Sequence, residues 1–384
     1  MQLCSRLLYM SQTAKSTSRR NQRVDMRAVA KLADVSIATV SRTINRIPSV
    51  NPVYADRVWS AVKLLGYVPD EQARALVSGR SRLIGVIISD ITNPFFPELI
   101  QRFEEEAIES NYEILIGSTA HDSRRMEICI DRVLQRKVEG VAVMTFGIEE
   151  PLLERLASQN IPLVFIDVAP KGRAISAITV DYSAGIREGV HHLVSLGHQR
   201  LAFIAGPKGL HSAECRKAAF LSAIKEFKIK IPKSHLYHGD HTLEGGMAAM
   251  RSILRSSDPI PTAVMCSNDM TAIGVMHAAY EAKLRIPEDI SVIGFDDIHI
   301  APFMIPPLTT IRMSCQEIAH AAFKALRSHL EEGKSCRQGG LDVGTKLMVR
   351  RSTALPRKTL YPASPHKRVS KAATAKRSAG KISG

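Results

Sequence analysis

The chain has 384 residues, of which 45% are hydrophobic and 23% are charged, a balance typical of soluble globular proteins. This length allows two or three domains. Apolar runs such as residues 83–88 are far shorter than the roughly 18 residues of a membrane span, so we expect a cytoplasmic protein without a membrane segment. The six cysteines are scattered and form no Cys-x-x-Cys pair, which argues against a zinc site.

The net charge of +15 is concentrated at the two ends of the chain. Residues 1–80 carry 13 Lys and Arg against 5 Asp and Glu, and residues 356–384 carry 8 against none, so each end contributes +8. A basic end on a nearly neutral body is typical of a nucleic-acid-binding head attached to a body with another task. Residues 356–384 are interpreted as a disordered basic tail, with added non-specific DNA affinity as the alternative.

Three short helices are expected near the start of the chain, after residues 1–23, which are interpreted as a disordered basic arm or as translation upstream of the natural start. Asp25 can cap the first helix, a short turn follows at 33–35, and Ser36 can cap the second helix. A third helix is expected over 53–65 and ends at Gly66. A tight turn between the first two of three helices indicates a helix-turn-helix, which we place at residues 24–68.

The second of these helices has one core-facing side and one side of small or polar residues. Val40 and Ile44 are expected to face the core. The opposite stripe consists of Ile37, Ala38, Ser41, Arg42 and Asn45. Small side chains let a helix enter a major groove, where Arg42 can reach a guanine or a phosphate. A three-helix domain that binds another protein is the alternative.

Residues 69–82 form a candidate hinge between the head and the body. The helical segment in this range is too short to be stable alone in water. It could order when two copies pack together or meet DNA, with Leu76 as an apolar wedge in a minor groove. A simple linker is the alternative.

From residue 83 to about 355, short β-rich runs alternate with amphipathic helices, which indicates parallel sheets covered by helices. This length favours two Rossmann-like lobes. We expect eight strands, at 83–89, 112–118, 140–146, 162–167, 177–181, 200–206, 262–268 and 291–297. Several strands end in polar residues, among them Asp90, Asp167, Asn268 and Asp296. Because ligands in open α/β sheets bind beyond the carboxyl ends of strands, these residues are expected to meet in one cleft.

The cleft has no sequence pattern that predicts catalysis. We find no phosphate-binding loop, no dinucleotide fingerprint, no nucleophile elbow and no His-Glu-x-x-His pair, so we expect no catalytic residue, no cofactor and no metal. The histidines that could be metal ligands are interpreted as helix-surface or loop residues; they are His191, His192, His235, His238 and His241.

Seven blocks in order give the chain a strong resemblance to the LacI/GalR family of bacterial transcription regulators, over about residues 24–355. They are "VAKLADVSIATVSRTIN", "LLGYVPDEQARAL", "IGVIISDITNPFF", "HLVSLGHQRLAFIAGP", "PTAVMCSNDMTAIGVM", "IPEDISVIGFDDIHIAPFMIPPLTTIR" and "LMVRRST". The resemblance implies an all-α helix-turn-helix head and an α/β body of periplasmic-binding-protein type. The first lobe is expected at about 83–180 and 310–338, and the second at about 181–309 and 339–355.

The resemblance also implies a partner and a ligand. Such a protein is a repressor that binds double-stranded, pseudo-palindromic operator DNA as a homodimer or a tetramer, in the cytoplasm and associated with the nucleoid. A small-molecule effector, expected to be a carbohydrate, binds between the lobes and alters the affinity for DNA. A solute-binding transport component with the same body, and a Rossmann-type enzyme, are the rival readings.

The resemblance, carried over motif by motif, also implies specific residues. The DNA-binding set implied by the family comprises Ser36, Ile37, Ala38, Thr39, Ser41, Arg42, Asn45, Ala73 and Leu76. In this set Ile37, Ala38 and Arg42 match base readers, Ser36, Thr39 and Ser41 are placed for phosphates, and Leu76 matches the hinge leucine. The effector-binding set comprises Phe95, Phe96, Asp167, Arg216, Asn268 and Asp296.

This sequence departs from the family pattern at four positions. Asp34 stands where the helix-helix turn usually has Gly, and Asp tolerates a left-handed backbone better than most residues. Ala28 replaces an Asp, Asp70 replaces an Asn before the hinge, and Ala219 replaces a Gly. The change at Asp70 adds negative charge near the DNA and is expected to weaken hinge binding.

Overall fold

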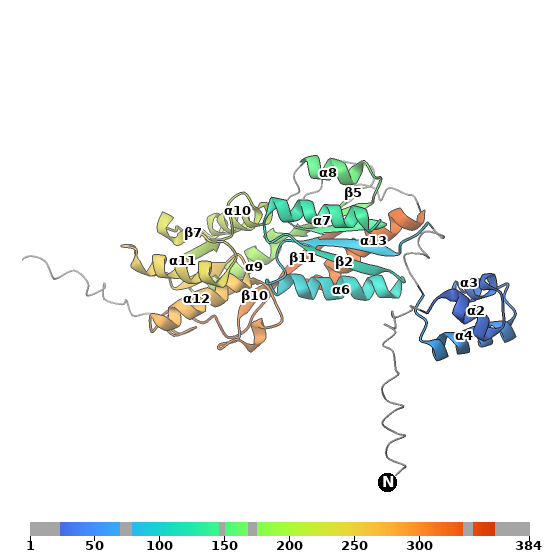
Figure 1. Cartoon of the computed structure of the whole chain (residues 1–384). Coiled ribbons are helices and arrows are strands. Elements are labelled where there is room, and N and C mark those ends of the chain that lie inside the picture. The colour runs from blue at the N-terminus through green and yellow to red at the C-terminus, as the bar shows by residue number, and fades with distance from the viewer. Residues whose placement is uncertain (1–23, 70–78, 146–149, 168–174, 333–340, 358–384) are drawn as a thin grey trace, which may run out of the picture. The chain divides into compact units, whose positions relative to one another are not determined.

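The computed structural model describes residues 24–69, 79–145, 150–167, 175–332 and 341–357, and the chain divides into two compact units, residues 1–81 and 82–384 (Figure 1). The helix-turn-helix head and the α/β body that the sequence predicts are both present. The expected basic arm, most of the candidate hinge and nearly all of the basic tail lie outside the described residues. No helix within the described ranges is long and apolar enough to cross a membrane.

The head consists of α2 (Met26–Ala33), α3 (Ile37–Ile44) and α4 (Pro52–Leu65). The predicted caps are confirmed, because the Asp25 carboxylate accepts the N–H of Ala28 at 2.9 Å and the Ser36 hydroxyl accepts the N–H of Thr39 at 3.0 Å. The small core is built from residues of all three helices; its fully buried members are Val29, Val40 and Val58.

The first lobe is a parallel sheet with helices on both faces. Its strands are β1 (Leu83–Ile88), β2 (Glu113–Ser118), β3 (Gly140–Met144), β4 (Leu163–Ile166) and β5 (Ile175–Asp181), in the spatial order β2-β1-β3-β4-β5. One face packs against α6 (Phe95–Glu109) and α13 (Cys315–Glu332), and the other against α7 (Ser123–Gln135) and α8 (Glu150–Ala157). Neighbouring residues on a strand point to opposite faces of the sheet. A strand with successive apolar residues therefore places apolar side chains on both faces.

The second lobe repeats this plan with strands in the order β10-β9-β8-β6-β7. They are β6 (Leu201–Ala205), β7 (Leu236–His238), β8 (Ala263–Cys266), β9 (Ser291–Asp296) and β10 (Thr309–Met313). Its helices pack in two pairs, α9 (Tyr182–Ser195) with α10 (His211–Glu226), and α11 (Leu243–Arg255) with α12 (Asp269–Glu281). Two short 3₁₀ helices, η1 (Lys233–His235) and η2 (Ala301–Phe303), complete the lobe.

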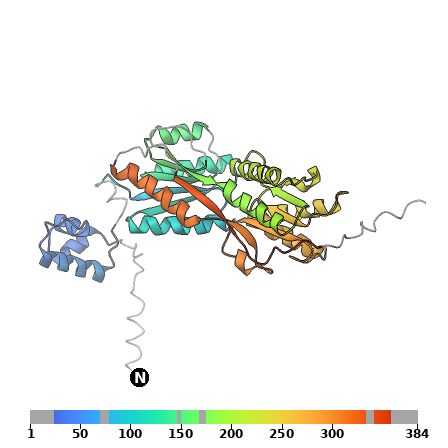
Figure 2. The same cartoon turned by 180° about the vertical axis from the view of Figure 1, so that it is seen from behind.

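The strand β11 (Leu341–Met348) belongs to both lobes. Its first half pairs in parallel with β5, and its second half pairs antiparallel with β10. Figure 2 shows this red-orange strand running from one lobe to the other. The lobe boundary expected at 310 therefore falls inside β10, which still pairs with β9, and residues 341–344 pair with the first lobe although 339–355 was expected in the second.

All eight predicted strands are present, but the structure adds β7, β10 and β11. The short β7 has only three residues, which leaves no room for an alternating pattern. The strand β11 contains Asp342, Gly344 and Lys346, and its pairing partner changes along its length. Its sequence therefore lacks the continuous apolar run of a buried parallel strand.

Candidate functional site

The helix α3 exposes most of the side chains that the sequence assigns to DNA. Ile37, Ala38, Arg42 and Asn45 are exposed, and the Ile37 side chain is 46% accessible although it is large and apolar. Val40 and Ile44 are buried, as predicted, and Thr43 is buried beside them. An exposed isoleucine beside an alanine and an arginine combines apolar surface with N–H donors, the two kinds of contact that base edges in a major groove accept.

The hydroxyl groups assigned to phosphates have partners inside the head. Ser36 and Thr39 lie with their hydroxyl oxygens 2.9 Å apart, while the Ser36 oxygen also caps α3. Ser41 is half-buried, and its hydroxyl accepts a long hydrogen bond of 3.5 Å from the Asn45 side chain. Ala73 and Leu76 lie outside the described residues.

In the body, five of the six expected effector residues line one pocket. We call it the interlobe pocket, and its lining consists of Asn93, Phe95, Phe96, Met144, Thr145, Ile166, Tyr182, Arg216, His241, Asn268, Asp296 and Met313. Several of these residues are the last in a strand, as Met144, Ile166 and Met313 are. This placement agrees with the rule that ligands bind beyond the carboxyl ends of parallel strands. The free volume of about 40 Å³ holds only a few waters, so a larger ligand needs the walls to move apart.

Arg216 of α10 is the central cation of the interlobe pocket. Its guanidinium lies 3.9 Å from the centre of the Phe295 ring and 5.0 Å from that of Tyr182. Its Nη1 donates to the carbonyl of Ser267 at 2.5 Å and lies 3.5 Å from the carboxylate of Asp296. Its buried Nε has no hydrogen-bond partner among the described residues. A ligand acceptor could satisfy this donor.

Asp296 and Asp167 are the two carboxylates near Arg216. Burial raises the pKa of Asp296 to about 7, although the Arg216 guanidinium acts in the opposite direction. Burial also raises the pKa of Asp167, against the hydrogen bond from Tyr182. The Tyr182 hydroxyl donates to the Asp167 carboxylate at 2.5 Å, and Tyr182 rather than Asp167 lines the pocket. Asp167 thus lies behind Tyr182 in this structure.

Asn268 lines the pocket but uses both of its polar atoms elsewhere. Its carbonyl oxygen caps α12 by accepting the N–H of Thr271 at 2.9 Å. Its amide nitrogen donates to the carbonyl of His241 at 2.9 Å. The side-chain oxygen of Asn268 has two lone pairs, so it has the capacity to accept one further hydrogen bond.

His241 is a pocket residue that sequence reasoning missed. Its Nε2 lies 2.8 Å from the Ser267 hydroxyl, and its ring packs so closely on Gly206 that a Cβ there would come within 2.0 Å of Nε2. Burial, together with the positive charge of Arg216, lowers the pKa of His241 to about 3, so the ring is neutral at physiological pH. Its position just after the carboxyl end of β7 would have indicated a place in the pocket, but a strand of three residues is too short to be recognised from the sequence.

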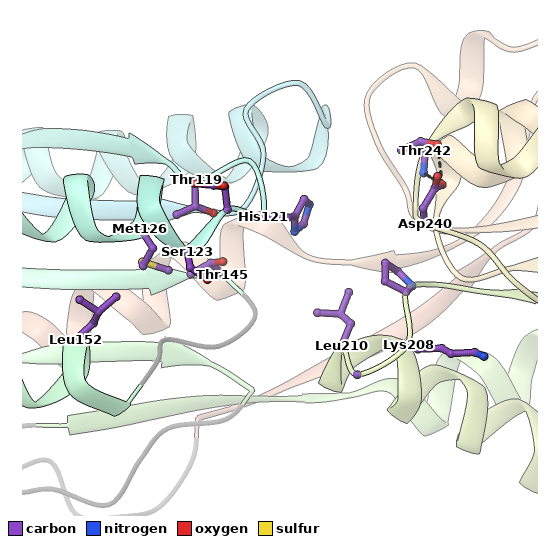
Figure 3. A pocket seen from close by; sticks show the side chains of 13 residues that line it. Thr119, His121, Ser123, Met126, Thr145, Leu152, Lys208, Leu210, Asp240 and Thr242 are labelled. Carbon is purple, nitrogen blue, oxygen red and sulfur yellow. Dashed lines mark hydrogen bonds between the residues drawn. The ribbon is translucent and has the colours of Figure 1, made fainter.

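A second cavity of about 550 Å³ shares Thr145 with the interlobe pocket. Figure 3 shows that its walls come from both lobes, with Thr119 and His121 on one side and Leu210, Asp240 and Thr242 on the other. Asp240 and Thr242 are hydrogen-bonded to each other at 2.7 Å. The two cavities therefore adjoin at Thr145.

None of the histidines that the sequence offered as metal ligands forms a metal cluster in the described part of the chain. His192 lies 3.0 Å from the Thr353 hydroxyl, and His191 packs against the Phe227 ring. His235 is buried, and His241 belongs to the interlobe pocket.

Comparison with known proteins shows which family combines such a head with a two-lobed body. The model of the bacterial regulatory proteins of the lacI family matches residues 25–70, and that of the periplasmic binding protein-like domain matches residues 190–353. The ribose operon repressor of Escherichia coli K12 is 35% identical over 303 residues, which cover 78% of this chain and 91% of that protein. The chain belongs to the LacI family.

Solved structures extend this likeness to the fold. A lac repressor dimer bound to operator and the anti-inducer ONPF is similar with a TM-score of 0.77 and 27% identity, over 87% of this chain and all of that chain. A LacI family regulator from Enterococcus faecium with bound ribose has a TM-score of 0.65 and 28% identity, over 72% of this chain and all of that one. The fold predicted from the sequence, a helix-turn-helix head on a body of periplasmic-binding-protein type, is confirmed.

Proposed function

We propose that this LacI family member is a transcriptional repressor whose affinity for a specific DNA duplex changes when a small, neutral, hydroxyl-rich molecule binds in the interlobe pocket. The observation that carries the proposal is the pairing of Arg216 and Asp296 on one lobe with Phe95 and Phe96 on the other. An aromatic wall can stack on a sugar ring, while the guanidinium and carboxylate can bind hydroxyls that both donate and accept.

The charge of the pocket supports a neutral ligand over an anionic one. Arg216 is the only lysine or arginine among the described residues that line the pocket, and it already lies beside the carboxyl groups of Asp296 and Asp167, so a phosphate or a carboxylate would meet no second cation there. The ligands of two structural neighbours agree with this chemistry, since one contains ribose and another, at 25% identity, contains cellobiose. D-ribose is therefore the first probe.

The proposed mode of DNA binding uses two copies of the chain. The lac repressor neighbour is a dimer bound to operator DNA, so we infer a homodimer with one α3 in each half of a pseudo-palindromic site in cytoplasmic DNA. The base-reading residues are then Ile37, Ala38 and Arg42, with Asn45 beside them. Ser36, Thr39 and Ser41 would contact phosphates, and Ala73 and Leu76 the minor groove. No catalytic role is proposed for any side chain.

The test measures binding of the full chain to fragmented genomic DNA, with and without D-ribose and at several salt concentrations. We expect a preferred duplex, a fall in affinity with salt and a change in affinity when the sugar is added. A solute-binding transport component would bind the sugar and show no preference among duplexes.

Matched arginine variants locate the sugar response. Arg216→Ala should remove the response to D-ribose but leave duplex binding unchanged. The control is Arg251→Ala, which breaks an exposed ion pair with Glu281 on the surface of the second lobe. A full sugar response in Arg216→Ala would move the ligand site away from the interlobe pocket.

A further inference from the structure

The last residue of β9 and the residue after it have an unusual backbone. Asp296 has a φ of 115° and Asp297 a φ of 59°, in the left-handed region that side-chain-bearing residues rarely adopt. Such a conformation persists only where surrounding contacts hold it in place. Because Asp296 carries the carboxylate that faces Arg216, the contacts that hold this turn also aim a pocket group.

Two arginines hold the side chain of Asp297, which is only 4% exposed. Arg312 donates to it through Nε at 2.7 Å, and Arg350 donates to its other oxygen through Nη2 at 2.5 Å. The Arg312 side chain is 51% exposed, whereas that of Arg350 is 16% exposed. The bond from Arg350 is therefore less screened by water, and it is the stronger anchor of the two.

Arg350 is itself fixed at two further points. Its Nη1 donates to the carbonyl of Leu308 at 2.8 Å, and its backbone N–H donates to the Thr309 hydroxyl at 2.9 Å. The guanidinium thus spans from the start of β10 to the carboxylate of Asp297. A planar fork with several donors is suited to such a bridge, and a lysine ammonium is not.

The other side of the turn is held by Asp269 at the start of α12. Its carboxylate accepts the N–H of Ile298 at 3.0 Å and the hydroxyl of Thr310 at 2.5 Å, and the residue is fully buried. The turn 296–298 is therefore clamped from both sides. The Arg350 side of the clamp continues directly from the strand that crosses between the lobes, because Arg350 follows the end of β11 by two residues. Thr310 and Arg312 connect to β11 through the pairing of β10 with that strand.

We propose that Arg350 is a positioning residue of the interlobe pocket: it grips Asp297 and thereby holds the strained backbone of Asp296, so that the Asp296 carboxylate faces the ligand. This inference rests on the proposed function of the pocket. It also implies a route of coupling, since a shift in β11 during lobe movement reaches Asp296 through Arg350.

The first test needs no ligand. Arg350→Ala is compared with Arg351→Ala, which removes the same side chain one residue later, at an exposed position where the backbone bond to Pro307 is kept. Hydrogen exchange of the peptide over 292–302 should become about tenfold faster in Arg350→Ala. Exchange in Arg351→Ala should match the wild type. Equal exchange in the two variants would overturn the clamp.

The second test separates positioning from general support of the fold. Calorimetric titration of the full chain with D-ribose should give a Kd about tenfold weaker in Arg350→Ala and unchanged in Arg351→Ala. Arg350→Lys, which keeps the charge without the fork, should recover only part of the loss. A purely structural role would lower the unfolding temperature of Arg350→Ala and leave its Kd unchanged, which would overturn the inference. If the wild type binds no D-ribose, the proposed ligand is wrong, while hydrogen exchange still decides the clamp.

Discussion

The guanidinium of Arg57 on α4 lies 3.0 Å from the carboxylate of Asp34, in the turn between α2 and α3. The same nitrogen donates to the Asp34 carbonyl at 3.3 Å. Asp34 has a φ of 51°, at the position where the LacI family usually has glycine. Arg57 therefore holds Asp34, whose backbone is left-handed, against α4. This contact offsets part of the steric cost of that backbone conformation, a cost that glycine does not have.

The effect of a substitution at Asp34 on the stability of the head should depend on how well the new residue tolerates a left-handed backbone. Asp34→Gly loses an exposed ion pair worth at most about 1 kcal/mol and gains a residue without steric cost, so the free energy of unfolding of the head should change by less than about 1 kcal/mol. Asp34→Val should lower it by about 1–2 kcal/mol, because a β-branched residue tolerates this region poorly. Trp59 is the only tryptophan in the chain and lies in α4, so its fluorescence during urea unfolding follows the head alone. Wild-type stability in Asp34→Val would contradict this account of the turn.

Arg42→Ala should relax the choice of operator. Arg42 is exposed on α3, and a bidentate contact to a guanine discriminates by about 1–3 kcal/mol against other bases. Selection from randomised duplexes should therefore show a loss of preference at one position in each half-site. Lys63→Ala on α4 is the control for charge alone, and it should weaken binding to all duplexes without changing the selected sequence. An unchanged preference in Arg42→Ala would reject the proposed docking of α3.

The sequence predicted the elements of the head almost to the residue because local capping signals mark the starts of α2 and α3 and the end of α4. Asp25, Ser36 and Gly66 act within about one helical turn, so no distant contact is needed to recognise them. In the body, β1 and β9 were equally clear as continuous apolar runs. The strand β11 was not, because its two halves join different sheets, and that change of partner is a property of the tertiary structure.

The interlobe pocket could be predicted in part from the family resemblance. Phe95 and Asp296 sit in blocks that resemble the family, Arg216 was carried over on the separate motif "RKAAF", and the structure brings the three residues together. His241 and Tyr182 could not be assigned, since their roles depend on which loops face each other across the pocket. Nothing local in the sequence shows that Tyr182 stands between Asp167 and the pocket, or that Arg350 reaches Asp297 from the end of the chain.

The raised pKa of Asp296 predicts a specific dependence of stability on pH. Burial raises this pKa to about 7, above the usual value of 3.8, so the folded state holds its proton more tightly than the unfolded state does. The resulting stabilisation is complete below about pH 4 and is lost as the pH rises through 7. Asp296→Asn has no proton to lose. Its free energy of unfolding should therefore rise relative to wild type between pH 5 and 7, on the order of 1 kcal/mol per pH unit.

A matched variant isolates the effect of Asp296 in urea unfolding at a series of pH values. Asp342→Asn removes an exposed carboxylate of β11, and its stability should stay parallel to wild type across this range. His241→Phe should change the profile in the opposite sense, because the pKa of His241 is lowered from 6.5 to about 3 in the folded protein. The unfolded ring binds a proton below about pH 6.5 while the folded ring does not, so this group makes stability rise with pH up to that value, and the variant loses that rise. A parallel profile in Asp296→Asn would show that this carboxyl is ionised throughout.

Glu98 connects the two lobes directly, and its removal should loosen them. The Glu98 carboxylate on α6 accepts the backbone N–H of His299 in the second lobe at 2.7 Å. A hydrogen bond to a charged group contributes about 1.5–3 kcal/mol, enough to shift an equilibrium between closed and open lobes roughly tenfold or more. Glu98→Ala should therefore increase the radius of gyration measured by small-angle scattering. Glu98→Gln keeps an acceptor and should stay near wild type, and Glu105→Ala, which breaks an exposed pair with Arg102 within α6, should have no effect. An unchanged radius of gyration in Glu98→Ala would mean that the covalent connections between the lobes, at β11 and between β10 and α13, keep the lobes together without this hydrogen bond.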